Sequence, residues 1–130
     1  MTNNDSLINA ALSTIVPDKD SQAATNASAV SAYLLFGKQG SLLKKIIPST
    51  KLRGIEIANR FPESQKLDEA LRSNCVWLYE AQNIPGHPAN DILQVLGLHC
   101  IEDICTKTGN PTVIRRMYNR AKANAQALAA

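Results

Sequence analysis

The prolines and glycines of this chain divide it into short segments, and each segment carries apolar residues at helical spacing. Between these breaks the apolar residues recur at intervals of three and four, and no stretch alternates for long enough to favour a β-strand. Aromatic residues make up only 5% of the chain, so we expect a mainly aliphatic core. The pattern predicts an all-α protein, a compact bundle of about six to seven helices. The breaks are Pro17, Gly37 to Gly40, Pro48, Pro62, Pro85 to Pro88 and Gly109 to Pro111.

The first 25 residues look different from the rest of the chain. Ser6 can cap a short helix whose apolar face includes Leu7, Ile8 and Leu12, and a polar stretch follows Pro17. We therefore expect residues 1–25 to form an N-terminal arm helix and a linker. Residues 26–130 are then expected to form a single helical domain, a size that suits one hydrophobic core, with an Ala-rich C-terminal tail.

Helix boundaries within the expected domain follow from the same breaks. Gly37 is expected to end the first of these helices, because glycine commonly follows the last turn of a helix. Apolar residues cover more than half the circumference of the segment 88–107, which predicts a central, buried helix. The expected helices are 26–36, 41–47, 49–61, 62–83, 88–107 and a last one that begins at Asn110-Pro111.

The reactive residue types are few and poorly placed for catalysis. The three cysteines, Cys75, Cys100 and Cys105, form no Cys-x-x-Cys pair, so we interpret them as small core residues rather than zinc ligands. His99 is adjacent to Cys100 in the sequence, and neighbours on a helix point apart. No glycine-rich phosphate loop is present. We expect no catalytic residue, no metal, no cofactor and no small-molecule substrate, and hence no enzyme activity.

The chain also lacks the marks of a secreted or membrane protein. Its first residues carry no basic group followed by an apolar run. Its longest apolar stretch is far shorter than the roughly 20 residues that span a bilayer. These observations predict a cytoplasmic protein, or one within a particle assembled in the cytoplasm, and no membrane partner.

Charge is strongly segmented along the chain, although the formal net charge is only +3. Residues 37–60 contain six lysines and arginines against Glu56, and residues 104–130 contain five with no acid. Between them, residues 61–103 contain seven acids against Lys66 and Arg72. One interpretation is that these blocks are only solvated helix faces. The other is that the two basic blocks bind phosphates.

The last expected helix has the stronger phosphate-binding pattern. Arginine forks onto phosphate oxygens, and asparagine reaches sugars or base edges. The segment around Pro48 adds hydroxyl groups and backbone amides at a helix start, which also suits phosphate. The candidate nucleic-acid-binding residues are Lys44, Lys45, Lys51, Arg53, Arg115, Arg116, Asn119, Arg120 and Lys122.

The same charge pattern suits self-assembly, since separate acidic and basic surfaces can pair head to tail and give rings or filaments. The short first helix and the Ala-rich tail look weak in isolation, which favours support from neighbouring subunits. Trp77 is expected to be partly exposed, as a subunit contact or a platform for base stacking. The candidate subunit contacts are Leu7, Ile8, Leu12 and Trp77.

Two hypotheses for function follow from these patterns. The first is a non-enzymatic, self-assembling homo-oligomer that coats nucleic acid, in the manner of a coat or nucleocapsid protein on single-stranded RNA. Such a protein would bind the backbone with little sequence preference and lose affinity with salt. The alternative is a small helical adaptor or chaperone, in which the charge blocks orient a protein partner.

Overall fold

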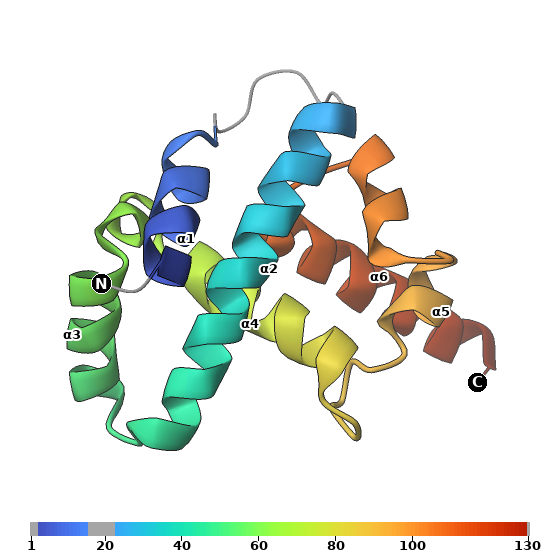
Figure 1. The fold of residues 1–130 in the computed structure, drawn as a ribbon. Coiled ribbons are helices and arrows are strands. Elements are labelled where there is room, and N and C mark those ends of the chain that lie inside the picture. The colour runs from blue at the N-terminus through green and yellow to red at the C-terminus, as the bar shows by residue number, and fades with distance from the viewer. Residues whose placement is uncertain (1–2, 16–22, 130) are drawn as a thin grey trace.

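The computed structural model describes residues 3–15 and 23–129, and every regular element in these ranges is helical (Figure 1). This confirms the predicted all-α bundle with a short N-terminal helix. In the described residues six α-helices and two 3-10 helices (η) follow one another, and none of the helices is long and apolar enough to cross a membrane. The elements are α1 (Asn3–Ser13), α2 (Ala23–Ile46), α3 (Thr50–Arg60), η1 (Pro62–Lys66), α4 (Glu69–Asn83), α5 (Ile92–Leu96), η2 (Ile101–Thr106) and α6 (Pro111–Ala129).

The long helix α2 crosses α4 at the centre of the molecule (Figure 1). A Cβ atom on Gly37 would lie 2.1 Å from the carbonyl oxygen of Cys75, and one on Gly40 would lie 2.6 Å from Cγ2 of Val76. The two glycines therefore permit a close backbone approach between the helices. The prediction that a helix ends at Gly37 was wrong, because α2 continues through both glycines to Ile46.

Two clusters of buried side chains lie along this crossing. In the first, Val30 and Leu78 pack with apolar residues of α5, η2 and α6. In the second, Phe36 meets Phe61 edge to face, with ring centroids 5.7 Å apart, a favoured geometry for aromatic pairs. Ile8 of α1 completes the second cluster, so α1 is part of the core. The predicted division into residues 1–25 and 26–130 stays a prediction, because most of the expected linker lies outside the described residues.

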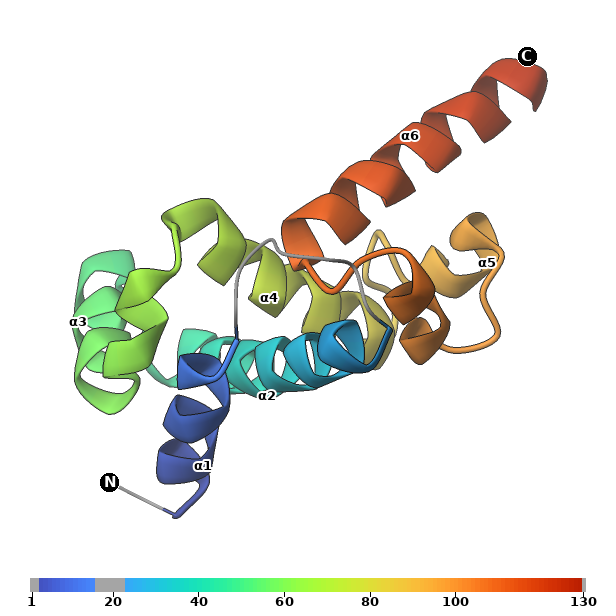
Figure 2. The ribbon, with the colours of Figure 1, turned by 90° about the horizontal axis from the view of Figure 1, so that it is seen from above.

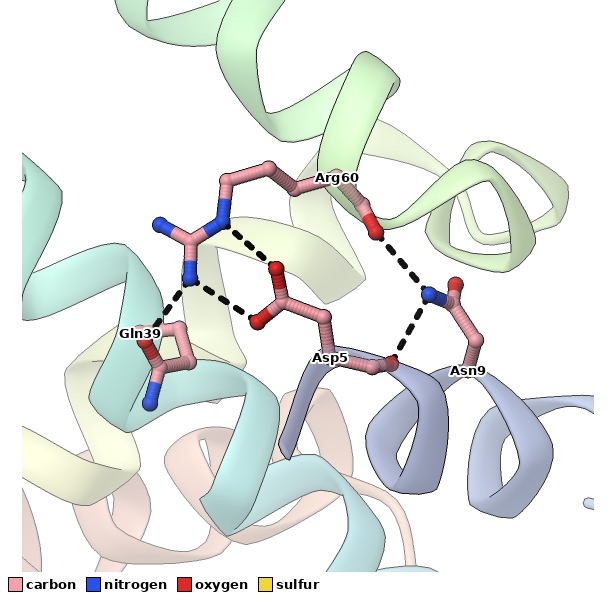
Figure 3. Close-up of polar contacts among 4 residues, drawn as sticks. All are labelled: Asp5, Asn9, Gln39 and Arg60. Carbon is pink, nitrogen blue, oxygen red and sulfur yellow. Dashed lines mark hydrogen bonds and ion pairs between the residues drawn. The ribbon is translucent and has the colours of Figure 1, made fainter. Parts of the chain in front are cut away.

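A buried ion pair fixes α1 against the end of α3 (Figure 3). The Asp5 carboxylate accepts hydrogen bonds from Nε and Nη2 of Arg60, both at 2.9 Å. The Asn9 amide donates to the carbonyl oxygens of Asp5 and Arg60, each at 2.9 Å. Gln39 of α2 accepts a further hydrogen bond from Arg60. The Asp5 side chain is 3% exposed and the Arg60 side chain is 28% exposed, so the carboxylate is the buried partner and the guanidinium reaches solvent.

The segment 62–83, expected as one helix, forms η1 and α4 with a short break between them. A new helix, α4, begins after the break because Asp68 caps it. The Asp68 carboxylate accepts a hydrogen bond from the backbone N–H of Leu71 at 2.7 Å. The guanidinium of Arg72 closes the same corner by donating to the carbonyl oxygens of Ser64 and Leu67.

The segment 88–107 differs most from its predicted form. It contains α5 and η2 rather than one central helix, because Gly97 adopts a left-handed conformation (φ 69°) that ends α5. The backbone N–H of Leu98 then donates to the carbonyl of Leu93 at 2.8 Å, as in a Schellman motif. The Asp103 carboxylate accepts from the N–H groups of His99 and Cys100 and so starts η2.

Helices α3 and α6 match their predicted spans closely. Ser49 caps α3 by accepting a hydrogen bond from the backbone N–H of Leu52. The side chain of Asn110 accepts from the N–H of Thr112 at 2.8 Å, at the start of α6. From there α6 packs on α4 and α5 and then runs outward from the body of the molecule (Figure 2).

Candidate nucleic-acid interface

Helix α6 carries the arginine-rich pattern, and its two faces have different roles. Ile114 and Tyr118 are buried in the core. From Ala123 to Ala129 every side chain is exposed, because no other described element covers the end of the helix (Figure 2). Five of the candidate binding residues lie on the part of α6 before this end. Arg115 and Lys122 are half-buried, and Arg116, Asn119 and Arg120 are exposed.

Arg115 is held by contacts inside the molecule. Its guanidinium donates to the side-chain oxygen of Asn74 at 2.9 Å and lies over the Trp77 ring, 5.0 Å from the ring centroid. The Trp77 ring also lies beside the Tyr118 ring, with ring centroids 5.8 Å apart, and packs against the first core cluster. Both side chains thus stabilise the packing of α6 on α4, and Arg115 occupies the ring face that a stacking base would need.

Lys122 is also held within the chain. Its ammonium forms an ion pair with Asp91, which in addition accepts a hydrogen bond from the Tyr118 hydroxyl at 2.7 Å. The hydrogen bonds from Lys122 and Tyr118 hold the pKa of Asp91 below its usual value. Burial raises the pKa of Tyr118, and the hydrogen bond to Asp91 adds to this. The cluster joins the loop before α5 to α6.

Arg116 and Arg120, in contrast, line a groove between α6, α5 and the end of η2, which we call the α5–α6 groove. The groove has a volume of about 500 Å³. Lys107, which follows η2, supplies a third cation to its wall. All three side chains are exposed, and within the described part of the chain none forms an ion pair or a hydrogen bond. The remaining lining residues are Val95, Leu96, Val113, Met117, Ala121 and Asn124.

The lining of the α5–α6 groove combines three cations with apolar side chains and includes no carboxylate. Three positive charges around an apolar floor favour a ligand that is both anionic and partly apolar. Single-stranded nucleic acid has this character, because its phosphates are charged and its bases are open to apolar contact. The volume lies within the range of roughly 300–1,000 Å³ that ligand sites usually have.

The four candidates from the 37–60 block lie elsewhere, in the last turn of α2 and the first turn of α3. Lys44 is paired with Glu80 of α4 at 3.1 Å. Arg53 donates to the carbonyl oxygens of Ile47 and Pro48, so it stabilises the turn. Only Lys45 and Lys51 of the four candidates in this block are exposed without such a contact. The structure therefore does not join the two basic blocks into one surface.

The four candidate subunit contacts are placed differently from one another. Leu7 is exposed, whereas Ile8 and Leu12 are buried within their own chain. This differs from the expectation for Ile8 and Leu12, because α1 packs its apolar face against α2 instead of against a neighbour. Trp77 is half-buried beneath Arg115.

Lys107 and Asn124 are groove residues that the sequence analysis did not select. The only sequence feature that could have indicated Lys107 is its membership of the second basic block, residues 104–130. Its position beside Arg116 depends on the turn between η2 and α6, which periodicity does not predict. Asn119, which was selected, is exposed on α6 outside the groove lining.

The cysteines and histidines form no chemical site in the described residues, where no group of three or more His, Cys, Asp or Glu could hold a metal ion. Cys75 and Cys105 are buried and Cys100 is half-buried. Burial raises the pKa of the Cys75 thiol far above its usual value, which makes it unreactive. His87 accepts a hydrogen bond from the backbone N–H of Ala89 and shapes its loop.

Comparison with protein families, curated proteins and solved structures finds no match to this chain. The α5–α6 groove and the surface of the helices are therefore the basis for a functional assignment.

Proposed function

We propose that this protein is a non-enzymatic, self-assembling protein that coats single-stranded RNA, and that the α5–α6 groove holds the RNA. The observation that carries the proposal is the groove itself, where Lys107, Arg116 and Arg120 surround an apolar floor without any carboxylate. The cations would contact phosphates, and the apolar side chains would contact the faces of unstacked bases.

A single strand fits this groove better than a duplex does. In a duplex the bases are stacked inside, so the strand would offer phosphates but nothing for Met117 or Leu96 to contact. Asn124 in the lining and Asn119 nearby offer amide groups to ribose hydroxyls and base edges. None of these contacts selects a sequence strongly, which suits a coat protein.

The assembly half of the proposal is supported by apolar side chains outside the groove. Leu7 on α1 and Leu128 near the end of α6 are both exposed, Leu128 to 88%. The two lie on different elements, so a contact between them across copies would be heterologous. Contacts of that kind build rings or filaments.

Binding of a fluorescently labelled oligouridylate, measured by anisotropy, tests the RNA half. We expect binding that weakens between about 50 mM and about 200 mM salt, and weaker binding of a duplex of equal length. The double variant Arg116→Gln/Arg120→Gln should bind at least tenfold more weakly, because two phosphate contacts are lost. Met117→Gln should also weaken binding, although it leaves the charge unchanged.

The matched control is Lys45→Gln/Lys51→Gln, which removes two exposed lysines at the α2–α3 turn. We expect this variant to bind the oligonucleotide nearly as well as the parent protein. Equal losses in both double variants would contradict the groove assignment, since they would indicate a general response to net charge. No binding at low salt would reject the RNA half altogether.

A further inference from the structure

The outer face of α2 is apolar although no described element covers it. Leu35, Leu42 and Ile46 are exposed to 48%, 40% and 73%. They lie seven and four residues apart, so they form one row along the helix. The opposite face of α2 packs on α4 through Gly37 and Gly40. The row therefore faces away from the core.

The spacing of this row is that of a coiled-coil seam. With Gln39 included, its members are separated by four, three and four residues, which alternates as positions a and d of a heptad do. Leu35 and Leu42 then occupy d positions, and Ile46 occupies an a position, where β-branched residues are favoured. Gln39 is tied to Arg60 at the edge of the seam. The face is thus shaped to receive another helix.

Two lysines flank the seam on one side. Lys38 and Lys45 are seven residues apart, both occupy g positions, and both are exposed. Neither forms an ion pair or a hydrogen bond within the described residues. Residues at e and g select partners by charge. A helix that packs along this seam would be stabilised by Glu or Asp at its flanking positions.

A second copy of this chain offers no such helix among its described elements. The only acid of α1, Asp5, is buried in its pair with Arg60. Helix α6 has no acidic residue. On α4, Glu80 is already paired with Lys44, and Glu69 stands alone in the first turn. Helix α3 exposes Leu52 and Ile55, but its single acid, Glu56, stands among three basic residues, and α5 has no acid. Charge complementarity among the described elements therefore favours a helix from a different protein.

We propose that the outer face of α2 docks an amphipathic helix of a second protein, with an apolar seam flanked by acidic residues. The lining of the α5–α6 groove includes no residue of α2. The proposal therefore stands independently of RNA binding. The protein could hold RNA in the α5–α6 groove and a partner helix on α2 at the same time.

Two synthetic peptides test the proposal on the full chain. Both contain three heptads (about 21 residues) with Leu at a and d; one has Glu at e and g, and the other has Lys. Like charges keep each peptide from associating with itself. We expect the Glu peptide to bind at least tenfold more tightly than the Lys peptide by isothermal titration calorimetry.

Variants of exposed residues then locate the binding surface. Lys38→Glu/Lys45→Glu should reverse the preference between the two peptides. Leu42→Asp should weaken binding of the Glu peptide at least tenfold. The matched control is Lys51→Glu/Leu52→Asp on α3, which changes the same residue types at exposed positions and should leave binding unchanged. Circular dichroism checks that each variant is folded.

Several outcomes would overturn the proposal. Equal affinity for both peptides, or an equal loss in the α3 control, would show that binding does not use the α2 seam. Sedimentation of the protein alone that changes with Leu42→Asp would identify the row as a contact between copies. Binding to phosphatidylserine vesicles that depends on the same residues, without peptide binding, would identify a membrane surface instead.

Discussion

The charged side chains of this protein divide into those that hold the fold together and those that remain available. Asp5 and Arg60 form a buried pair, and Lys122 holds the loop before α5 through Asp91. Arg116 and Arg120 have no partner in the described part of the chain. By sequence alone, all of these except Asp5 belong to the charge blocks, because periodicity shows which face a residue occupies but not which distant residue it meets.

The Asp91 carboxylate makes the stability of the protein depend on acidity. Hydrogen bonds from Lys122 and Tyr118 lower the pKa of Asp91 in the folded state. Its contribution to stability is complete above the usual aspartate pKa of about 3.9 and is lost as the pH falls through the lower folded value. Asp91→Asn should therefore lower the melting temperature by a few degrees at neutral pH.

Thermal melts of the parent protein and of Asp91→Asn over a range of pH check this dependence. The gap between the two melting temperatures should be constant near neutrality and close in strong acid. Tyr118→Phe keeps the ion pair and should show most of the parent's pH dependence. A gap that is the same in strong acid as at neutrality would contradict the role of the carboxylate charge.

At the scale of the elements, isolated helices with clear caps were predictable, and contacts between helices were not. The Ser49 cap and the Asn110-Pro111 start located α3 and α6 correctly. Glycine is a residue type that often ends a helix, which made Gly37 look like a helix end. Its actual role is to let the backbone of α4 approach α2 closely. Long-range contacts of that kind leave no periodic signal in the local sequence.

The crossing of α2 and α4 should be very sensitive to added volume. Gly37→Ala would place a methyl group 2.1 Å from the carbonyl oxygen of Cys75, and the backbone cannot move aside without separating the helices. We expect a loss of about 3 kcal/mol in the free energy of unfolding, at the upper end of the range for overpacking. Urea denaturation followed by circular dichroism measures the change.

Gly54 on α3 provides the matched control, because a Cβ atom there meets no other atom within 4 Å. Gly54→Ala should stabilise the protein by about 0.5–1 kcal/mol, since alanine is the better helix former. If the two substitutions shifted the denaturation midpoint in the same direction, the close approach at Gly37 would not be the cause.

At the scale of the whole molecule, the fold presents three surfaces: the α5–α6 groove, the outer face of α2 and the exposed end of α6, which meets the groove at Asn124. The charge blocks indicated where cations are concentrated, and five of the nine candidate residues are exposed and unpaired: Lys45, Lys51, Arg116, Asn119 and Arg120. The groove itself could not be predicted, because its walls come from α5, from α6 and from Lys107, which follows η2. The end of α5 depends on Gly97 and the start of η2 depends on Asp103.

The exposed end of α6 should matter for assembly and little for stability. The described residues that a chain ending at Ala125 loses, 126–129, are all exposed, so its melting temperature should match that of the parent. We expect the shortened chain to bind a short oligonucleotide normally but to form fewer large complexes on long RNA. Electron microscopy and sedimentation velocity measure that difference.

Two point variants of the full chain refine this test. Leu128→Ser removes the large apolar side chain of the helix end and should reproduce the assembly defect. Gln126→Ser alters a neighbouring exposed position and should not. Normal complexes from both the shortened chain and Leu128→Ser would show that assembly uses another surface.

The glycine crossing also has a consequence for how this protein can diverge. In most of the core, a larger residue on one helix can be balanced by a smaller one opposite it. At Gly37 there is no such freedom, because backbone lies against backbone and no side chain remains to be reduced. Descendants of this chain can therefore drift widely while a glycine persists at this one position of α2, whereas Gly40 meets only the Val76 side chain, which can become smaller. That glycine would reveal common ancestry after overall identity has faded.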